Sequence, residues 1–133
     1  MNSKTAVNTM LLFIIAVTIF HFSIILKIIP YDITWGGRLK NDTEMYLFET
    51  ISIIINFLLI ITLLIKGKFI KQLLSARIVN IILWVFLILF VLNTIGNLFA
   101  KTNFEKFFGV LTLACSILIW IILKGKYRDS TTM

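Results

Sequence analysis

Two ionisable side chains lie inside apolar stretches of this sequence: the imidazole of His21, the only histidine, and the carboxylate of Glu49. An imidazole exchanges protons near neutral pH, and a carboxylate beside it can accept or return a proton. Ionisable groups are costly in an apolar environment, so each is a candidate functional residue. We therefore expect His21 and Glu49 to form the proton-exchanging part of a site.

Polar residues at helical spacing accompany both candidates. Ser52 and Asn56 follow Glu49 at three and seven positions, which places all three on one face of a helix. Asn93 and Asn97 are four positions apart in a later apolar run. Such residues either hydrogen-bond between helices or line a ligand site, and both interpretations stay open. Together with two residues of the intervening connection, the predicted ligand-binding residues are His21, Glu49, Ser52, Asn56, Asn93, Asn97, Trp35 and Arg38.

The sequence offers little for metal or redox chemistry. It contains one cysteine, Cys115, so no disulfide and no CxxC pair can form within the chain. A single histidine likewise argues against a histidine-rich metal site. We expect no cofactor and no bound metal.

The composition is that of a protein dissolved in lipid. The 133 residues are 59% hydrophobic and 14% charged, with a mean hydropathy of +1.01. A soluble domain of this size carries about 25% charged residues. The net charge of +7 does not indicate nucleic-acid binding, because the basic residues form short clusters beside apolar runs.

Four apolar runs organise the chain, approximately at 6–29, 46–65, 78–99 and 108–123. A helix needs about 20 apolar residues to cross a membrane, and the segment NFEKF could extend the short fourth run. Spanning segments must satisfy their own backbone hydrogen bonds, which favours helices. We expect residues 1–133 to form one all-α transmembrane domain, an up-down-up-down four-helix bundle with an outer loop at 30–45.

The orientation of the bundle follows from its basic residues, which concentrate on the cytoplasmic side of membrane proteins. With both termini inside, eight basic residues are cytoplasmic and five face outward. The eight are Lys4, Lys66, Lys68, Lys71, Arg77, Lys124, Lys126 and Arg128, and the five are Lys27, Arg38, Lys40, Lys101 and Lys106. We expect both termini in the cytoplasm and the protein in the plasma (inner) membrane of a bacterium.

Four of the six acidic residues fall within 31–49, around the predicted outer loop. This crowding favours an outward-opening polar pocket that binds or transports a small amphipathic or lipid-like ligand. Two other hypotheses fit the same residues. The protein could be a membrane-embedded lipid isomerase that uses Glu49 and His21 as acid and base. It could also be an accessory or immunity-type subunit that recognises a partner through residues 31–45.

Small residues line one face of the last apolar run, where Gly109, Thr112 and Ser116 recur at helical spacing. Small side chains let helices approach closely, so we expect this face to pack against another helix or a second copy. The expected partners are therefore the lipid bilayer, a small lipophilic ligand and a homodimer partner.

Overall fold

The computed structural model describes residues 2–33, 39–100 and 102–125, so the predicted site residues Trp35 and Arg38 lie outside the described residues. The described chain is all-helical. A short 3-10 helix, η1, follows the first of four long helices. The elements are α1 (Ser3–Ile25), η1 (Tyr31–Ile33), α2 (Asp42–Lys66), α3 (Ala76–Leu98) and α4 (Asn103–Lys124). Each long helix has the length and apolarity needed to cross a membrane, which suggests a membrane protein.

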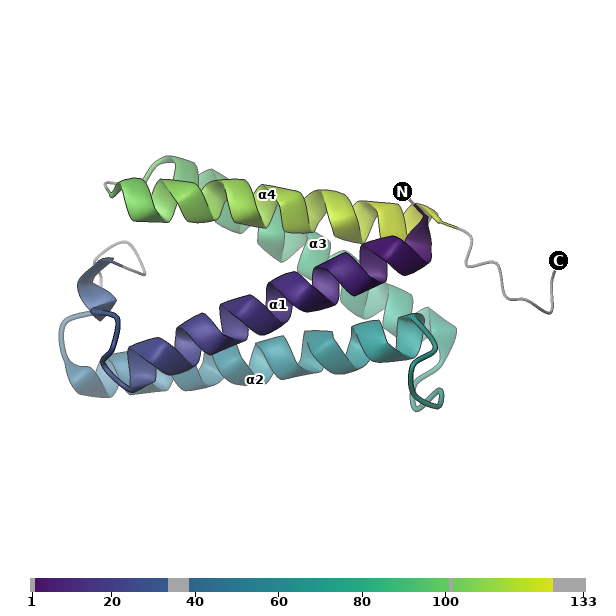
Figure 1. Cartoon of the computed structure of the whole chain (residues 1–133), viewed down its shortest axis with the longest axis horizontal. Helices are drawn as coiled ribbons and strands as arrows, with labels where there is room; N and C mark the ends of the chain where they lie inside the picture. The colour runs from purple at the N-terminus through teal and green to yellow at the C-terminus, as the bar shows by residue number, and fades with distance from the viewer. Residues whose placement is uncertain (1, 34–38, 101, 126–133) are drawn as a thin grey trace, which may run out of the picture.

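The four helices alternate in direction, so α1 begins and α4 ends at the same end of the bundle (Figure 1). In this view α1 runs diagonally, from the C-terminal part of α4 to the N-terminal part of α2. The α3–α4 contact is the most extensive, followed by α1–α2, α1–α4 and α2–α3. We call the end with connections 26–41 and 99–102 the acidic end, and the opposite end, with connection 67–75, the basic end.

Capping residues set the helix starts at the acidic end. The Asn41 side chain accepts a hydrogen bond from the Glu44 backbone N–H, and α2 therefore starts at Asp42, not at the beginning of the apolar run. Before α4, the Thr102 hydroxyl accepts from the Glu105 N–H and donates to the Glu105 carboxylate. This N-cap starts α4 at Asn103 and incorporates the NFEKF segment.

The first helix ends before its apolar run does. Lys27 has φ 62°, its N–H donates to the Ile24 carbonyl at 2.9 Å, and the Ile28 N–H donates to the Ser23 carbonyl at 2.9 Å. These bonds form a helix-terminating Schellman motif with lysine in the left-handed position that glycine usually takes. Pro30 also disfavours helical backbone at Ile29. The helix predicted to reach residue 29 therefore ends at Ile25.

The small-residue face of α4 packs against α3, as the sequence predicts. Gly109 is buried, and a Cβ placed on it would lie 3.3 Å from the Cβ of Asn97 on α3. The Thr112 and Thr94 hydroxyls are 2.9 Å apart across the same interface, and Ser116 is also buried. Close approach and an interhelical hydrogen bond thus hold α3 and α4 together.

Candidate functional site

His21 and Glu49 contact each other across the α1–α2 interface. The Nδ1 atom of the imidazole is hydrogen-bonded to Oε2 of the carboxylate, so the two groups form an ion pair when His21 is protonated. The Glu49 side chain is 0% exposed and that of His21 is 17% exposed. Glu49 lies seven residues beyond Asp42, the first residue of α2, which corresponds to about 10 Å along the helix at 1.5 Å per residue.

An aromatic cluster borders the pair on the side of α4. The ring of Phe20 lies edge-on to His21, with the centroids 5.9 Å apart and the planes at 64°. The same ring packs against Phe108 and Phe104 of α4, at centroid distances of 4.9 and 5.6 Å. These contacts fix α1 beside α4 and give the imidazole an apolar neighbour.

An apolar cap separates the pair from the acidic end. It consists of Ile24, Leu39 and Met45, which are buried and form one cluster. Ile24 is one turn beyond His21 on α1, and Met45 is one turn before Glu49 on α2. Leu39 comes from the connection and packs onto both. The pair therefore lies one helical turn beneath a layer of three apolar side chains.

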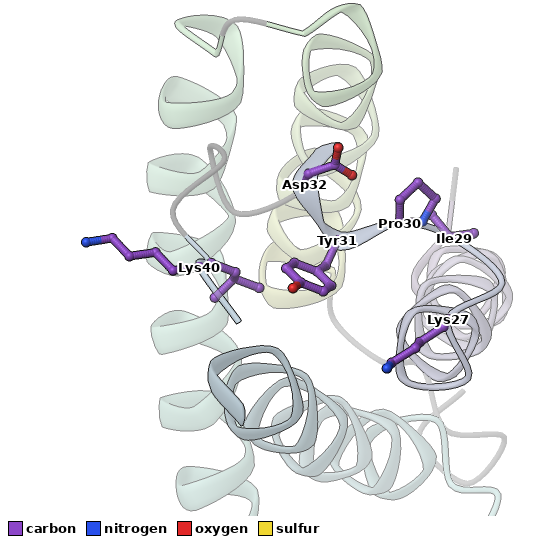
Figure 2. A pocket seen from close by; sticks show the side chains of 7 residues that line it. Lys27, Ile29, Pro30, Tyr31, Asp32 and Lys40 are labelled. Atoms are coloured by element: carbon purple, nitrogen blue, oxygen red, sulfur yellow. The ribbon is translucent and has the colours of Figure 1, made fainter. Parts of the chain in front are cut away.

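A pocket of about 490 Å³ opens on the other side of this cap, with Leu39 in its wall. Its lining residues are Lys27, Ile29, Pro30, Tyr31, Asp32, Leu39 and Lys40. Figure 2 shows Tyr31 projecting between Lys27 and Lys40, whereas Asp32 points away from this ring. The pocket lining combines apolar side chains with three charged ones, which suits an amphipathic ligand.

One wall of the pocket is held by Asp42. Its carboxylate accepts a hydrogen bond from the Lys27 ammonium at 2.5 Å. The hydrogen bond and the charge of Asp42 raise the pKa of Lys27. Partial burial and then the charge of Asp42 raise the pKa of Tyr31. Lys27 therefore stays a cation and Tyr31 a neutral hydroxyl at neutral pH.

Asn56 and Ser52, predicted to share the site with Glu49, bond to groups other than the His21–Glu49 pair. The Asn56 amide donates to the Thr18 hydroxyl at 3.2 Å, and Thr18 donates to the Ile14 carbonyl. Asn56 thus joins α2 to α1 about two turns deeper than Glu49. The Ser52 hydroxyl donates to the Phe48 carbonyl within its own helix.

The asparagines of α3 do not reach the pair. Asn93 is exposed, and no hydrogen bond of its side chain is found within residues 2–33, 39–100 and 102–125. Asn97 is partly buried and lies against Gly109 of α4. The structure therefore joins His21 to Glu49 and places Asn56 below them, while Asn93 and Asn97 occupy other surfaces.

Sequence reasoning predicted a pocket at this end of the bundle but did not identify most of its lining residues or the apolar cap. The opposite charges of Lys27 and Asp42 at the ends of successive helices were a usable signal for the pocket wall. No feature of the sequence indicated that Leu39 and Met45 would be buried together, because a connection can fold back over a helix end in many ways.

The paired groups can exchange one proton while their combined charge stays zero. Because Glu49 engages Nδ1, the other ring nitrogen, Nε2, is the one available to a bound molecule. Among the described residues no group of three His, Cys, Asp or Glu side chains could hold a metal ion. The site can therefore bind an ion-pairing group or act as an acid and a base. No protein-family model, curated protein or solved structure matches this chain.

Proposed function

We propose that this protein is an integral membrane protein that binds or transports a small amphipathic or lipid-like ligand at its acidic end. The His21–Glu49 pair is the proton-linked group of this site. The observation that carries the proposal is the complete burial of Glu49 against the only histidine, beneath an open pocket.

The membrane orientation is part of the proposal. Both termini lie in the cytoplasm and the acidic end faces outward, because eight of the 13 basic residues then lie inside. The protein is placed in the plasma (inner) membrane of a bacterium. In this orientation the pocket opens to the external solution, and the His21–Glu49 pair lies just below the outer membrane boundary.

The pair is not needed to hold α1 and α2 together. The Asn56–Thr18 hydrogen bond and the apolar cap already join these helices. A buried ion pair can often be replaced by apolar side chains of similar volume without loss of stability. An ionisable pair kept in a membrane helix interface is therefore better explained by function.

The pocket and the pair together suggest how an amphipathic cation binds. Its apolar part displaces Leu39 from the cap, and its charged group reaches the Glu49 carboxylate. There it replaces the imidazolium of His21, which releases its proton to the solvent. Binding is then coupled to the release of one proton, as a proton-linked carrier requires.

The test uses purified protein in lipid nanodiscs and radiolabelled tetraphenylphosphonium, a lipophilic cation, as the probe. We expect binding that strengthens as the pH rises, loss of binding in Glu49→Gln, and an altered pH dependence in His21→Ala. Glu105→Gln is the matched control, because Glu105 is also buried but accepts a hydrogen bond from the Thr102 hydroxyl at the start of α4. Equal binding by Glu49→Gln and the wild type would overturn the proposal.

A second candidate is a membrane-embedded lipid isomerase, favoured by the contact between Nδ1 of His21 and Glu49. A carboxylate in this position orients the imidazole and leaves Nε2 to move a proton on the substrate. This candidate predicts an isomerised lipid product formed by the purified protein, whereas the binding proposal predicts unchanged ligand.

A further inference from the structure

The basic end of the bundle carries only positive charge in the part of the chain described. All five described acidic residues, Asp32, Asp42, Glu44, Glu49 and Glu105, lie toward the opposite end. The described basic residues of the basic end are Lys4, Lys66, Lys68, Lys71, Arg77 and Lys124. This end therefore presents a surface that is complementary to anions.

The connection between α2 and α3 adds apolar side chains to this surface. The side chains of Phe69, Ile70 and Leu73 are 49%, 38% and 64% exposed. Lys68 precedes Phe69 in the sequence, and Lys71 follows Ile70. The connection loops out to one side at the end of α2 (Figure 1). Exposed apolar and basic side chains in one segment are typical of a segment that lies in the membrane interface.

Lys66 is the deepest cation of the basic end. It is the last residue of α2 and partly buried, and its ammonium donates to the Asn80 side-chain oxygen on α3 at 2.8 Å. That oxygen belongs to a neutral amide, so the charge of Lys66 is not compensated by it. An ammonium has three donors, and Asn80 uses one. Lys66 can therefore donate to an anion that approaches from the basic end.

We propose that the basic end binds the headgroups of anionic phospholipids. Lys66, Lys71 and Arg77 contact the headgroup phosphate, while Phe69, Ile70 and Leu73 enter the boundary of the acyl chains. This proposal requires the bundle to lie in a membrane, but it does not depend on a ligand at the acidic end.

The apolar residues favour a lipid over other polyanions. Binding to a nucleic acid or to free phosphate would leave Phe69, Ile70 and Leu73 in water. A lipid surface accommodates both kinds of side chain at once, with the phosphates near the cations and the acyl chains near the apolar residues.

The test compares lipid retention by the full chain in detergent, measured by native mass spectrometry with equal amounts of phosphatidylglycerol and phosphatidylcholine. The variant is Lys66→Gln/Lys71→Gln, in which glutamine at 66 can still donate to Asn80. The matched control, Lys106→Gln, removes one exposed charge from the acidic end and is compared with Lys71→Gln, which removes one exposed charge from the basic end. We expect the wild type to retain phosphatidylglycerol preferentially, and each lysine removed from the basic end to weaken this preference about fivefold at low salt.

Three results would overturn the proposal. These are an unchanged preference in the basic-end variant, an equal loss in the acidic-end control, and displacement of phosphatidylglycerol by millimolar inorganic phosphate, which would indicate a site for free phosphate. If the double variant loses helical circular dichroism, Lys71→Gln is used instead, because Lys71 is exposed in the connection. Its expected loss is about fivefold.

Discussion

Removing one member of the His21–Glu49 pair should destabilise the protein more than removing both. In His21→Leu, Glu49 stays fully buried without its imidazole partner. Breaking a buried charge pair from one side costs about 3–5 kcal/mol. In Glu49→Leu, the remaining imidazole is 17% exposed and is therefore partly solvated. The cost is then nearer that of one hydrogen bond to a charged group, about 1.5–3 kcal/mol. We therefore expect His21→Leu to be the more destabilising single substitution.

The double variant tests whether the two side chains act as a unit. With both groups apolar, no charge is left buried, and the double variant should lie within about 1 kcal/mol of the wild type. The coupling energy is the double variant's loss less the sum of the single losses, and we expect a magnitude of at least about 3.5 kcal/mol. It can be measured from unfolding in mixed detergent micelles with increasing sodium dodecyl sulfate, followed by circular dichroism.

The control cycle uses the exposed pair Lys27→Gln and Asp42→Asn, whose side chains are 53% and 49% exposed. Solvent screens this pair, so its coupling should stay below about 1 kcal/mol. Additive losses at His21 and Glu49, within about 0.5 kcal/mol, would refute the inference that their contact is a buried, energetically coupled pair.

Three further predictions concern packing, backbone and topology. Gly109→Leu should destabilise the protein by about 2 kcal/mol through overpacking against α3. Gly96→Leu should cost nothing measurable in the same thermal unfolding assay, because no atom lies within 4 Å of a Cβ placed there. Lys68→Gly should stabilise by about 1 kcal/mol in detergent unfolding, since Lys68 has φ 61°. In intact cells and a cysteine-free background, an impermeant thiol reagent should label Lys40→Cys and leave Ile70→Cys unlabelled; the reverse pattern would contradict the proposed orientation.

The helices could be predicted from the sequence, but their ends could not be placed from hydropathy. A stretch of about 20 apolar residues specifies a spanning helix through its length. The ends depend on single polar residues instead. Asn41 and Thr102 start their helices four or five residues before the apolar runs begin, and Lys27 ends α1 within its run. Capping signals were therefore more informative about boundaries than hydropathy.

Helix periodicity predicted which candidate site residues share a face of one helix. It could not predict which of them contact a neighbouring helix, because that depends on how the helices cross. Glu49 and Asn56 share a face of α2, and both meet α1, at His21 and Thr18. Asn93 lies seven residues beyond Phe86, on nearly the same face of α3, yet it is exposed whereas Phe86 is buried. The difference arises because α3 diverges from α2 toward the acidic end (Figure 1). Periodicity shows which residues share a face, but not which part of that face meets a neighbour.

The crowding of carboxylates within 31–49 has a structural cause as well as a proposed functional one. Asp42 pairs with Lys27, and Glu44 accepts a hydrogen bond from the Lys40 backbone N–H at 3.3 Å. Glu49 binds His21, so three of the four carboxylates tie the start of α2 to α1 or to the preceding connection. The interactions of Asp42 and Glu44 are exposed to solvent, and such surface interactions are common in proteins without a functional role. Glu49 differs because its contact is buried, and Asp32 differs because it lines the pocket. Glu49 is therefore the carboxylate on which ligand binding should depend.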